Sequence, residues 1–140
     1  MEQLKLENQL CFPLYAASRE VIKRYKPYLD ELDLTYTQYI AMMVLWEKGK
    51  VSAKELGDRL FLDSGTLTPL LKSLAGKGYV ERRRNQEDER VLDVILTDKG
   101  RAIEQKAAQV PYHMGECLPF TREEAQELYQ LLYKLLDRLE

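Results

Sequence analysis

The 140-residue sequence contains few of the residue types that bind metals or cross-link small domains. It has one histidine and two cysteines, and Cys11 and Cys117 lie 106 positions apart. Zinc sites need several such ligands at short spacings, so the sequence predicts neither a metal site nor any other bound cofactor. Two cysteines that lie so far apart in the sequence also do not predict a disulfide-rich framework.

Long apolar runs are equally absent, so no transmembrane helix is predicted. The first ten residues, MEQLKLENQL, lack the basic and apolar segments of a signal peptide. We therefore expect a cytoplasmic protein with no membrane partner, whose thiols stay reduced. Each cysteine is then either a small buried apolar residue or a redox-active group. The sequence shows no Ser/His/Asp set and no dinucleotide-binding loop, and we do not expect an enzyme.

The charge is unevenly distributed along the chain. Residues 48–101 contain 12 Lys+Arg and 9 Asp+Glu, whereas the remaining residues contain 9 and 14. A basic centre between acidic flanks indicates that the centre binds an anion.

Apolar periodicity and capping residues predict four helices, a β-hairpin and two further helices. Pro27 is expected to kink or break the first helix near its end. The predicted ranges are helices in 8–32, 35–50, 52–61 and 63–78, strands in 79–83 and 91–96, and helices in 97–110 and 121–140. Two short helices followed by a hairpin are typical of a winged helix-turn-helix. The expected fold is therefore mainly α with a small β-hairpin wing.

The outer helices are apolar over too much of their circumference to be covered from one side. The last helix carries the widest apolar stripe, formed by Leu128, Leu131, Leu132, Leu135, Leu136 and Leu139. The stripe is either intramolecular core or a homodimer interface, and we favour the homodimer. The expected organisation is one domain over 1–140, with dimerisation helices in 1–34 and 98–140 and a DNA-binding region in 35–97.

The second helix of a helix-turn-helix enters the major groove with its N-terminal residues. Small hydroxyl residues there suit close approach to phosphates or bases, and a helix N-terminus itself attracts phosphate. The candidate DNA-binding residues of this helix are Ser64, Thr66, Thr68 and Lys72. The alternative is that Ser64 and Thr66 only cap the helix.

The predicted wing is rich in arginine. Arg82, Arg83 and Arg84 lead into the hairpin tip, and Arg90 leaves it. An arginine on such a tip can enter the negatively charged minor groove, and Asp88 can hold the Arg90 side chain. The alternative is a solvated loop whose acidic residues dilute its positive charge. The predicted partner is double-stranded operator DNA.

The stretch LDSGTLTPLLKSLAGKGYVERRRNQEDERVLDVILTDKG resembles the MarR family of dimeric winged-helix regulators. The resemblance covers essentially the whole chain and is most specific in DER…LT..G. It implies that the outer helices dimerise, that Arg90 enters the minor groove and that Asp88 orients Arg90. The segments LENQLCFPLY, YKPYLDELDLTYTQY and LDSGTLTPLL are similar to the OhrR branch, which consists of repressors that sense organic hydroperoxides.

Cys11 lies in or just before the first turn of the predicted first helix, where Pro13 is tolerated. The partial positive charge of a helix N-terminus favours the thiolate, which peroxide oxidises to sulfenic acid. The apolar neighbours of Cys11 oppose this unless hydrogen-bond donors hold the anion. The resemblance to OhrR nominates Tyr25 and Tyr36 as these donors.

Helix geometry limits how Tyr25 can act. Cys11 and Tyr25 would lie about 21 Å apart on one straight helix, so Tyr25 can support Cys11 only across a two-fold interface. The alternative for Tyr25 and Tyr36 is ordinary packing between helices. A pocket that also includes Phe12 and Tyr15 would favour apolar peroxides over hydrogen peroxide.

Cys117 is a candidate resolving cysteine. A sulfenic acid condenses with a nearby thiol to form a disulfide. The resemblance implies this role, because some OhrR-like proteins carry a second cysteine near the C-terminal end that acts on the partner subunit. The alternative is that Cys117 is a buried spectator. An intersubunit disulfide, a mixed disulfide and an over-oxidised thiol all remain open as the oxidised form.

The sequence thus predicts a homodimeric repressor that binds a pseudo-palindromic operator when reduced. Oxidation of Cys11 by organic hydroperoxides or related oxidants would release the operator. One alternative is a MarR-type regulator that responds to a small aromatic ligand and has structural cysteines. A thiol peroxidase is a third possibility, but no arginine or threonine is placed near Cys11 to activate a bound peroxide.

Overall fold

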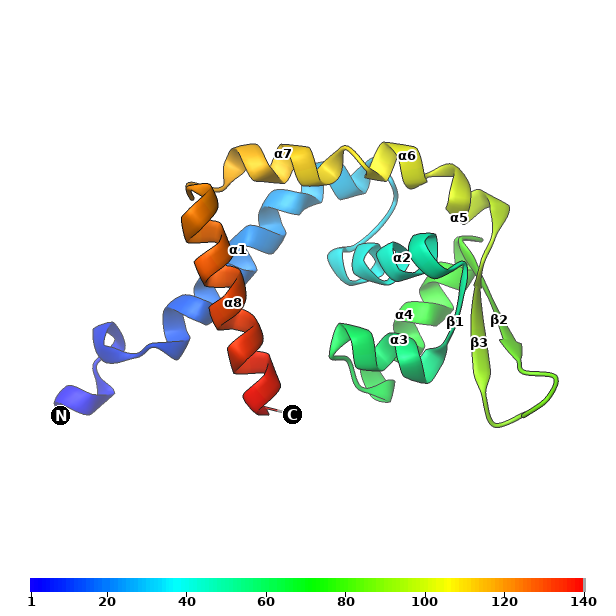
Figure 1. Ribbon diagram of the computed structural model, residues 1–140, viewed down its shortest axis with the longest axis horizontal. Helices are drawn as coiled ribbons and strands as arrows, with labels where there is room; N and C mark the ends of the chain where they lie inside the picture. The colour runs from blue at the N-terminus through cyan, green and yellow to red at the C-terminus, as the bar shows by residue number, and fades with distance from the viewer. Residues whose placement is uncertain (140) are drawn as a thin grey trace. The chain divides into compact units, whose positions relative to one another are not determined.

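The computed structural model describes residues 1–139, which form two compact units that divide after Val110 (Figure 1). The first unit contains two short 3-10 helices, most of the α-helices and the only sheet among the described residues. Its elements are η1 (Glu2–Leu4), η2 (Leu6–Asn8), α1 (Cys11–Asp30), α2 (Tyr36–Lys48), β1 (Lys50–Ser52), α3 (Ala53–Leu60), α4 (Ser64–Gly76), β2 (Val80–Arg84), β3 (Leu92–Leu96), α5 (Asp98–Ala102) and α6 (Glu104–Ala107). Helix α7 (Val110–Cys117) begins at the boundary, and α8 (Arg122–Leu139) lies in the second unit.

The sequence predicted the starts of the central helices because their capping residues are local. Thr35 and Gln38 form a capping box at α2, in which each side chain bonds the backbone of the other residue. The Ser52 hydroxyl accepts from the Glu55 N–H at 3.1 Å and caps α3. The Asp63 side chain caps α4, at the first residue of the predicted range 63–78.

The sheet contains the predicted hairpin and one additional strand. Its order is β1-β3-β2, and both neighbouring pairs are antiparallel. Val94 of β3 lies opposite Val51 of β1 and Arg82 of β2. The three residues of β1 are too few to show an alternating pattern, so the sequence did not predict this strand.

Two helix predictions differ from the structure. Helix α1 continues through Pro27 and ends at Asp30, so of the two predicted effects, a kink or a break, the break does not occur. Pro27 lies in the last turn, where its ring removes a single hydrogen bond. The helix predicted over 97–110 is divided at Ile103 into α5 and α6, and Pro111 is the second residue of the unpredicted α7. A helix start is a position where proline is tolerated.

The winged-helix core is built from one face of each central helix and the sheet. Leu45 of α2, Leu56 of α3, Leu71 and Leu74 of α4 and Val94 of β3 are all fully or almost fully buried. These residues fix α3, α4 and the hairpin relative to one another. The core therefore gives the outward-facing side chains of α4 and the hairpin defined positions.

Large apolar side chains remain exposed outside this core. Phe12, Leu14 and Tyr15 are exposed at the start of α1, and α8 has no buried residue among those described. The exposed apolar residues of α8 are Leu128, Tyr129, Leu131, Tyr133, Leu135 and Leu139. Glu140, the last residue of the predicted dimerisation segment, lies outside the described residues. Within residues 1–139, no helix is both long and apolar enough to cross a membrane.

Candidate nucleic-acid interface and thiol site

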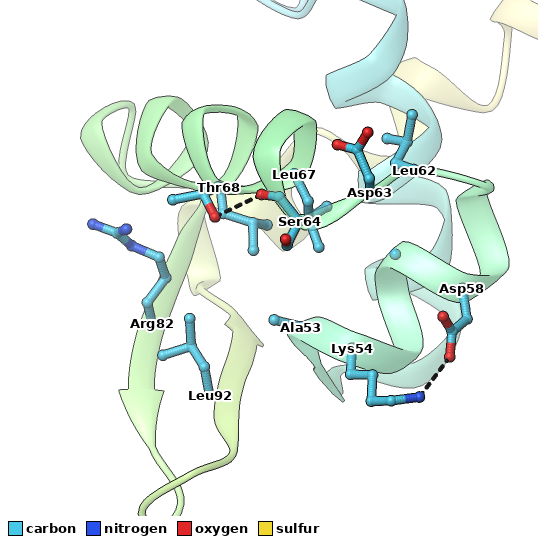
Figure 2. A pocket seen from close by; sticks show the side chains of 12 residues that line it. Ala53, Lys54, Asp58, Leu62, Asp63, Ser64, Leu67, Thr68, Arg82 and Leu92 are labelled. Carbon is cyan, nitrogen blue, oxygen red and sulfur yellow. Dashed lines mark hydrogen bonds and ion pairs between the residues drawn. The ribbon is translucent and has the colours of Figure 1, made fainter.

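Helices α3 and α4 and the hairpin border a groove of about 390 Å³ (Figure 2). The turn between the two helices approaches α3 closely, because a Cβ at Gly57 would lie 3.0 Å from the Leu62 carbonyl oxygen. Leu67 is buried beneath the groove, whereas Ser64 and Thr68 are exposed along it. The N-terminal turn of α4 therefore presents hydroxyl groups on an open surface.

Asp63, and not Ser64 or Thr66, is the N-cap of α4. Its carboxylate accepts a hydrogen bond from the Thr66 backbone N–H at 2.7 Å. This bond, with others from the Thr66 side chain and the Gly65 backbone, lowers the pKa of Asp63. The Thr68 hydroxyl donates to the Ser64 carbonyl at 2.8 Å, so it can only accept from a ligand. Lys72 is exposed further along the same helix.

The structure pairs Asp88 with Arg90 in the loop between β2 and β3. The Arg90 Nε and Nη2 atoms donate to the two Asp88 carboxylate oxygens at 3.0 and 3.1 Å. The Arg90 backbone N–H also donates to Asp88 at 3.0 Å. These bonds, the side-chain bond first, lower the pKa of Asp88, so the carboxylate stays ionised. The Arg90 side chain is 91% exposed, and the Asp88 carboxylate holds its guanidinium at the wing surface.

The other predicted wing arginines are consecutive on β2 but have different surroundings. Arg82 and Leu92 lie on the wing side of the groove (Figure 2). Arg83 forms an ion pair with Glu81 at 2.8 Å, and Arg84 lines a separate recess beside Asn85. Arg82 therefore faces the α4 side of the hairpin, in the same groove as Ser64 and Thr68.

Cys11 is the first residue of α1 and is exposed. Its helix has no side-chain cap at Leu10 and no acidic residue in its first turn. Within residues 1–139, no side chain donates a hydrogen bond to the Cys11 sulfur. Cys117 is the last residue of α7, in the second unit, and is also exposed. Neither thiol is therefore buried within a single chain.

Tyr25 and Tyr36 lie together, with ring centroids 4.8 Å apart, and Tyr39 completes the cluster. Burial and then Tyr36 raise the pKa of Tyr25, and burial raises the pKa of Tyr36. Burial, with the two neighbouring tyrosines, raises the pKa of Tyr39 to about 12. All three side chains are therefore neutral phenols at pH 7 that can donate hydrogen bonds.

Cys11 and this tyrosine cluster are separated within one chain. Cys11 and Tyr25 belong to the same uninterrupted α1, where their spacing corresponds to about 21 Å. Tyr15 is exposed and packs with Arg19, whose Nη1 donates to the Tyr15 hydroxyl at 3.3 Å. Phe12 and Tyr15 lie about 15–20 Å from Tyr25 along the axis. A pocket that joins all these residues therefore requires a second chain.

Three residues of the groove and the wing were not predicted from the sequence. Lys54 of α3 lines the groove and forms an ion pair with Asp58 at 3.2 Å. Asn85 and Asp93 are joined across the wing by a hydrogen bond of 3.0 Å. An asparagine at the end of a strand is a common turn residue, and this was the available signal for Asn85.

Comparison with known proteins identifies related regulators. Residues 23–107 match the family described as transcriptional regulator SarA/Rot. The chain is 46% identical to the organic hydroperoxide resistance transcriptional regulator of Bacillus subtilis, over 99% of this chain and 94% of that protein.

Two solved structures of protein–DNA complexes are similar to the chain over nearly its whole length. Reduced AbfR bound to DNA has a TM-score of 0.82 and 36% identity, covering 99% of this chain and 98% of that chain. AbfR is a protein of Staphylococcus epidermidis. A cysteine-to-serine mutant of Escherichia coli MarR, complexed with operator DNA, has a TM-score of 0.78 and 30% identity, covering 91% of this chain and 93% of that chain.

Proposed function

The chain belongs to the SarA/Rot family of transcriptional regulators and has the winged-helix fold of MarR-type proteins, and from this premise we propose that it is a redox-sensing repressor whose sensor is Cys11. The reduced homodimer binds a pseudo-palindromic operator in the cytoplasm, and oxidation of Cys11 by an organic hydroperoxide releases it. The observation that carries this proposal is the exposed thiol at the first position of α1. The thiolate is the form of a cysteine that peroxides oxidise to a sulfenic acid.

DNA binding is assigned to the wing and to the face of α4 that borders the protein groove between α3, α4 and the hairpin. The α4 N-terminus enters the major groove, where Ser64 and Thr66 contact phosphates or base edges, the Thr68 hydroxyl accepts a hydrogen bond from a base amino group, and Lys72 contacts a phosphate. Arg90, held by Asp88, enters the adjacent minor groove, while Arg82 and Arg84 contact the backbone. The similarity to reduced AbfR, whose structure was solved bound to DNA, supports this assignment.

The homodimer is supported by the apolar surfaces of the outer helices. The exposed side chains of α1 and α8 leave more apolar surface in water than a soluble monomer normally does. A two-fold partner would cover both helices and place two α4 helices about one turn of DNA apart. The same symmetry brings the Tyr25 and Tyr36 phenols of one subunit to the Cys11 thiolate of the other.

The sensing reaction transfers one oxygen atom to Cys11. The thiolate attacks the terminal peroxide oxygen, the O–O bond breaks, and the alkoxide leaves and is protonated to an alcohol. Exposed Leu10, Phe12 and Leu14 are neighbours of Cys11 in the sequence and favour peroxides with an apolar substituent. The sulfenic acid then reacts with the Cys117 thiol of the partner subunit, which forms the S–S bond and releases water.

A second candidate function comes from an apolar recess of about 340 Å³ between α1 and the start of α2. Ile22 and Leu29 contribute to its apolar lining, and Arg19, Lys23 and Lys26 also line it, with Lys26 paired to Asp30. This combination suits a small aromatic carboxylate that acts as an inducer. A regulator of that kind would release DNA on addition of such a ligand under reducing conditions, and Cys11→Ser would not alter the response.

Arg90→Ala tests the assignment of the wing. Because the guanidinium contacts DNA, the variant is expected to lose roughly 1–3 kcal/mol of operator binding while it stays dimeric. Fluorescence anisotropy at fixed salt measures the affinity, and sedimentation measures the assembly. Lys106→Ala removes an exposed cation outside the wing and should bind like the wild type. Wild-type affinity for Arg90→Ala would remove the wing from the binding surface.

Tyr25→Phe and Tyr36→Phe test the support of the thiolate. Each variant removes a hydrogen bond to an anion, and we expect Cys11 oxidation to slow by roughly tenfold with DNA binding retained. Stopped-flow measurement of sulfenic acid formation gives the rate, and Tyr112→Phe provides an exposed control. Oxidation rates equal to the wild type for both variants would leave Tyr25 and Tyr36 as packing residues only.

A further inference from the structure

The loop that carries Arg90 is organised by one side chain that precedes it. Asn85 follows the last residue of β2, and its backbone N–H donates to the Val91 carbonyl at 2.9 Å. The Val91 N–H in turn donates to the Asp88 carbonyl at 3.0 Å. The loop 85–91 is therefore closed at its base and again at Asp88.

The Asn85 side chain fixes the backbone at Asp88. Its Oδ1 atom accepts from the Glu87 N–H at 2.9 Å and from the Asp88 N–H at 3.1 Å. Its Nδ2 atom donates to the Asp93 carboxylate at 3.0 Å. The amide therefore uses both lone pairs of its oxygen and one of its two N–H groups, so its orientation is fully specified.

Asp93 anchors this amide to the sheet. The residue is 7% exposed on β3, and the Nζ atom of Lys50 on β1 lies 3.6 Å from its carboxylate. A carboxylate with so little contact to water needs hydrogen-bond donors, and Asn85 supplies one. The contact therefore links the rigid three-stranded sheet to the exposed loop.

We propose that Asn85 and Asp93 act as a positioning pair for Arg90. Asp93 holds the Asn85 amide, Asn85 holds the Asp88 backbone, and the Asp88 carboxylate holds the guanidinium. An exposed ion pair such as Asp88–Arg90 contributes little by itself, because two mobile side chains must be ordered. A fixed Asp88 reduces the conformational freedom that Arg90 loses when it binds DNA. The inference rests on the proposed contact of Arg90 with DNA.

A double-mutant cycle separates positioning from a general structural effect. The probe is a duplex that wild-type protein selects from a random-sequence library. We expect Asn85→Ala to weaken binding about threefold to tenfold, and to cause no further loss in the Arg90→Ala background. Gln86→Ala, an exposed neighbour in the same loop, should bind like the wild type. Equal losses in the two backgrounds would overturn the proposal.

Exchanging the side chains of Asn85 and Asp93 tests whether a conservative double substitution restores DNA binding. Asn85→Asp alone places two carboxylates together and should weaken binding. The double variant Asn85→Asp/Asp93→Asn restores a donor and an acceptor with their positions reversed, and it should recover affinity to within about twofold of the wild type. Failure to recover, in a variant with wild-type thermal stability, would contradict the proposal.

An NMR measurement without DNA distinguishes this inference from the proposed function. The Nε–H resonance of Arg90 reports its hydrogen bond to Asp88. We expect this resonance to shift in Asn85→Ala and to return in the exchanged variant. An unchanged resonance in Asn85→Ala refutes the positioning role. Wild-type operator affinity for Arg90→Ala, together with a shifted resonance, would instead refute the contact between the wing and DNA.

Discussion

Cys11→Ser is expected to bind the operator with wild-type affinity and to retain it at hydroperoxide concentrations that release the wild-type protein. Serine keeps the size of the side chain but cannot be oxidised to a sulfenic acid. Because Cys11 is exposed and separate from the α4 groove and the wing, its replacement should disturb neither surface. A titration of DNA release with cumene hydroperoxide measures the response.

Cys117→Ser is the matched control for this experiment. It removes the other exposed thiol and leaves the sensor in place, so the first oxidation step should proceed at the wild-type rate. The account would be contradicted if Cys11→Ser still released the operator on oxidation. In that case another group senses the oxidant.

Oxidised wild-type protein is expected to run as a covalent dimer on a non-reducing gel. A disulfide brings the Cα atoms of Cys11 and Cys117 within about 7 Å, and the proposed partner thiol belongs to the other subunit. We expect the outer helices to rearrange as this bond forms. Such a rearrangement would change the spacing of the two α4 helices and lower operator affinity.

The single-cysteine variants identify the bond. The covalent band should be absent in both Cys11→Ser and Cys117→Ser, and dithiothreitol should remove it from the wild type. A monomeric band for fully oxidised wild-type protein would exclude the intersubunit bond. Tryptic mapping of that band would then distinguish an intramolecular disulfide from an over-oxidised Cys11.

The fold was predictable where its determinants are local. The Thr35, Ser52 and Asp63 caps and the strand pattern on both sides of the loop 85–91 define the winged helix within short segments. The predicted MarR-type fold is confirmed by the similarity to MarR and AbfR. Strand β1 was not predictable, because its three residues become a strand only by pairing with β3.

The candidate site shows the same difference between local and distant contacts. The spacing of two residues between Asp88 and Arg90 allowed their pairing to be predicted, and the structure contains it. The Asn85–Asp93 contact joins residues on both sides of a loop, and no sequence pattern indicates it. The Tyr25–Tyr36 contact depends on how α1 packs against α2, and local periodicity does not indicate it. The resemblance nominated these two residues only as donors to Cys11.

Operator binding through one cycle of oxidation and reduction tests the central claim most directly. Reduced protein is bound to a duplex that it selected, an organic hydroperoxide is added, and dithiothreitol follows, with anisotropy recorded throughout. The account predicts binding, then release, then recovery, because the sulfenic acid and the disulfide are both reducible. Unchanged binding after stoichiometric oxidation of Cys11, verified by mass spectrometry, would contradict the account.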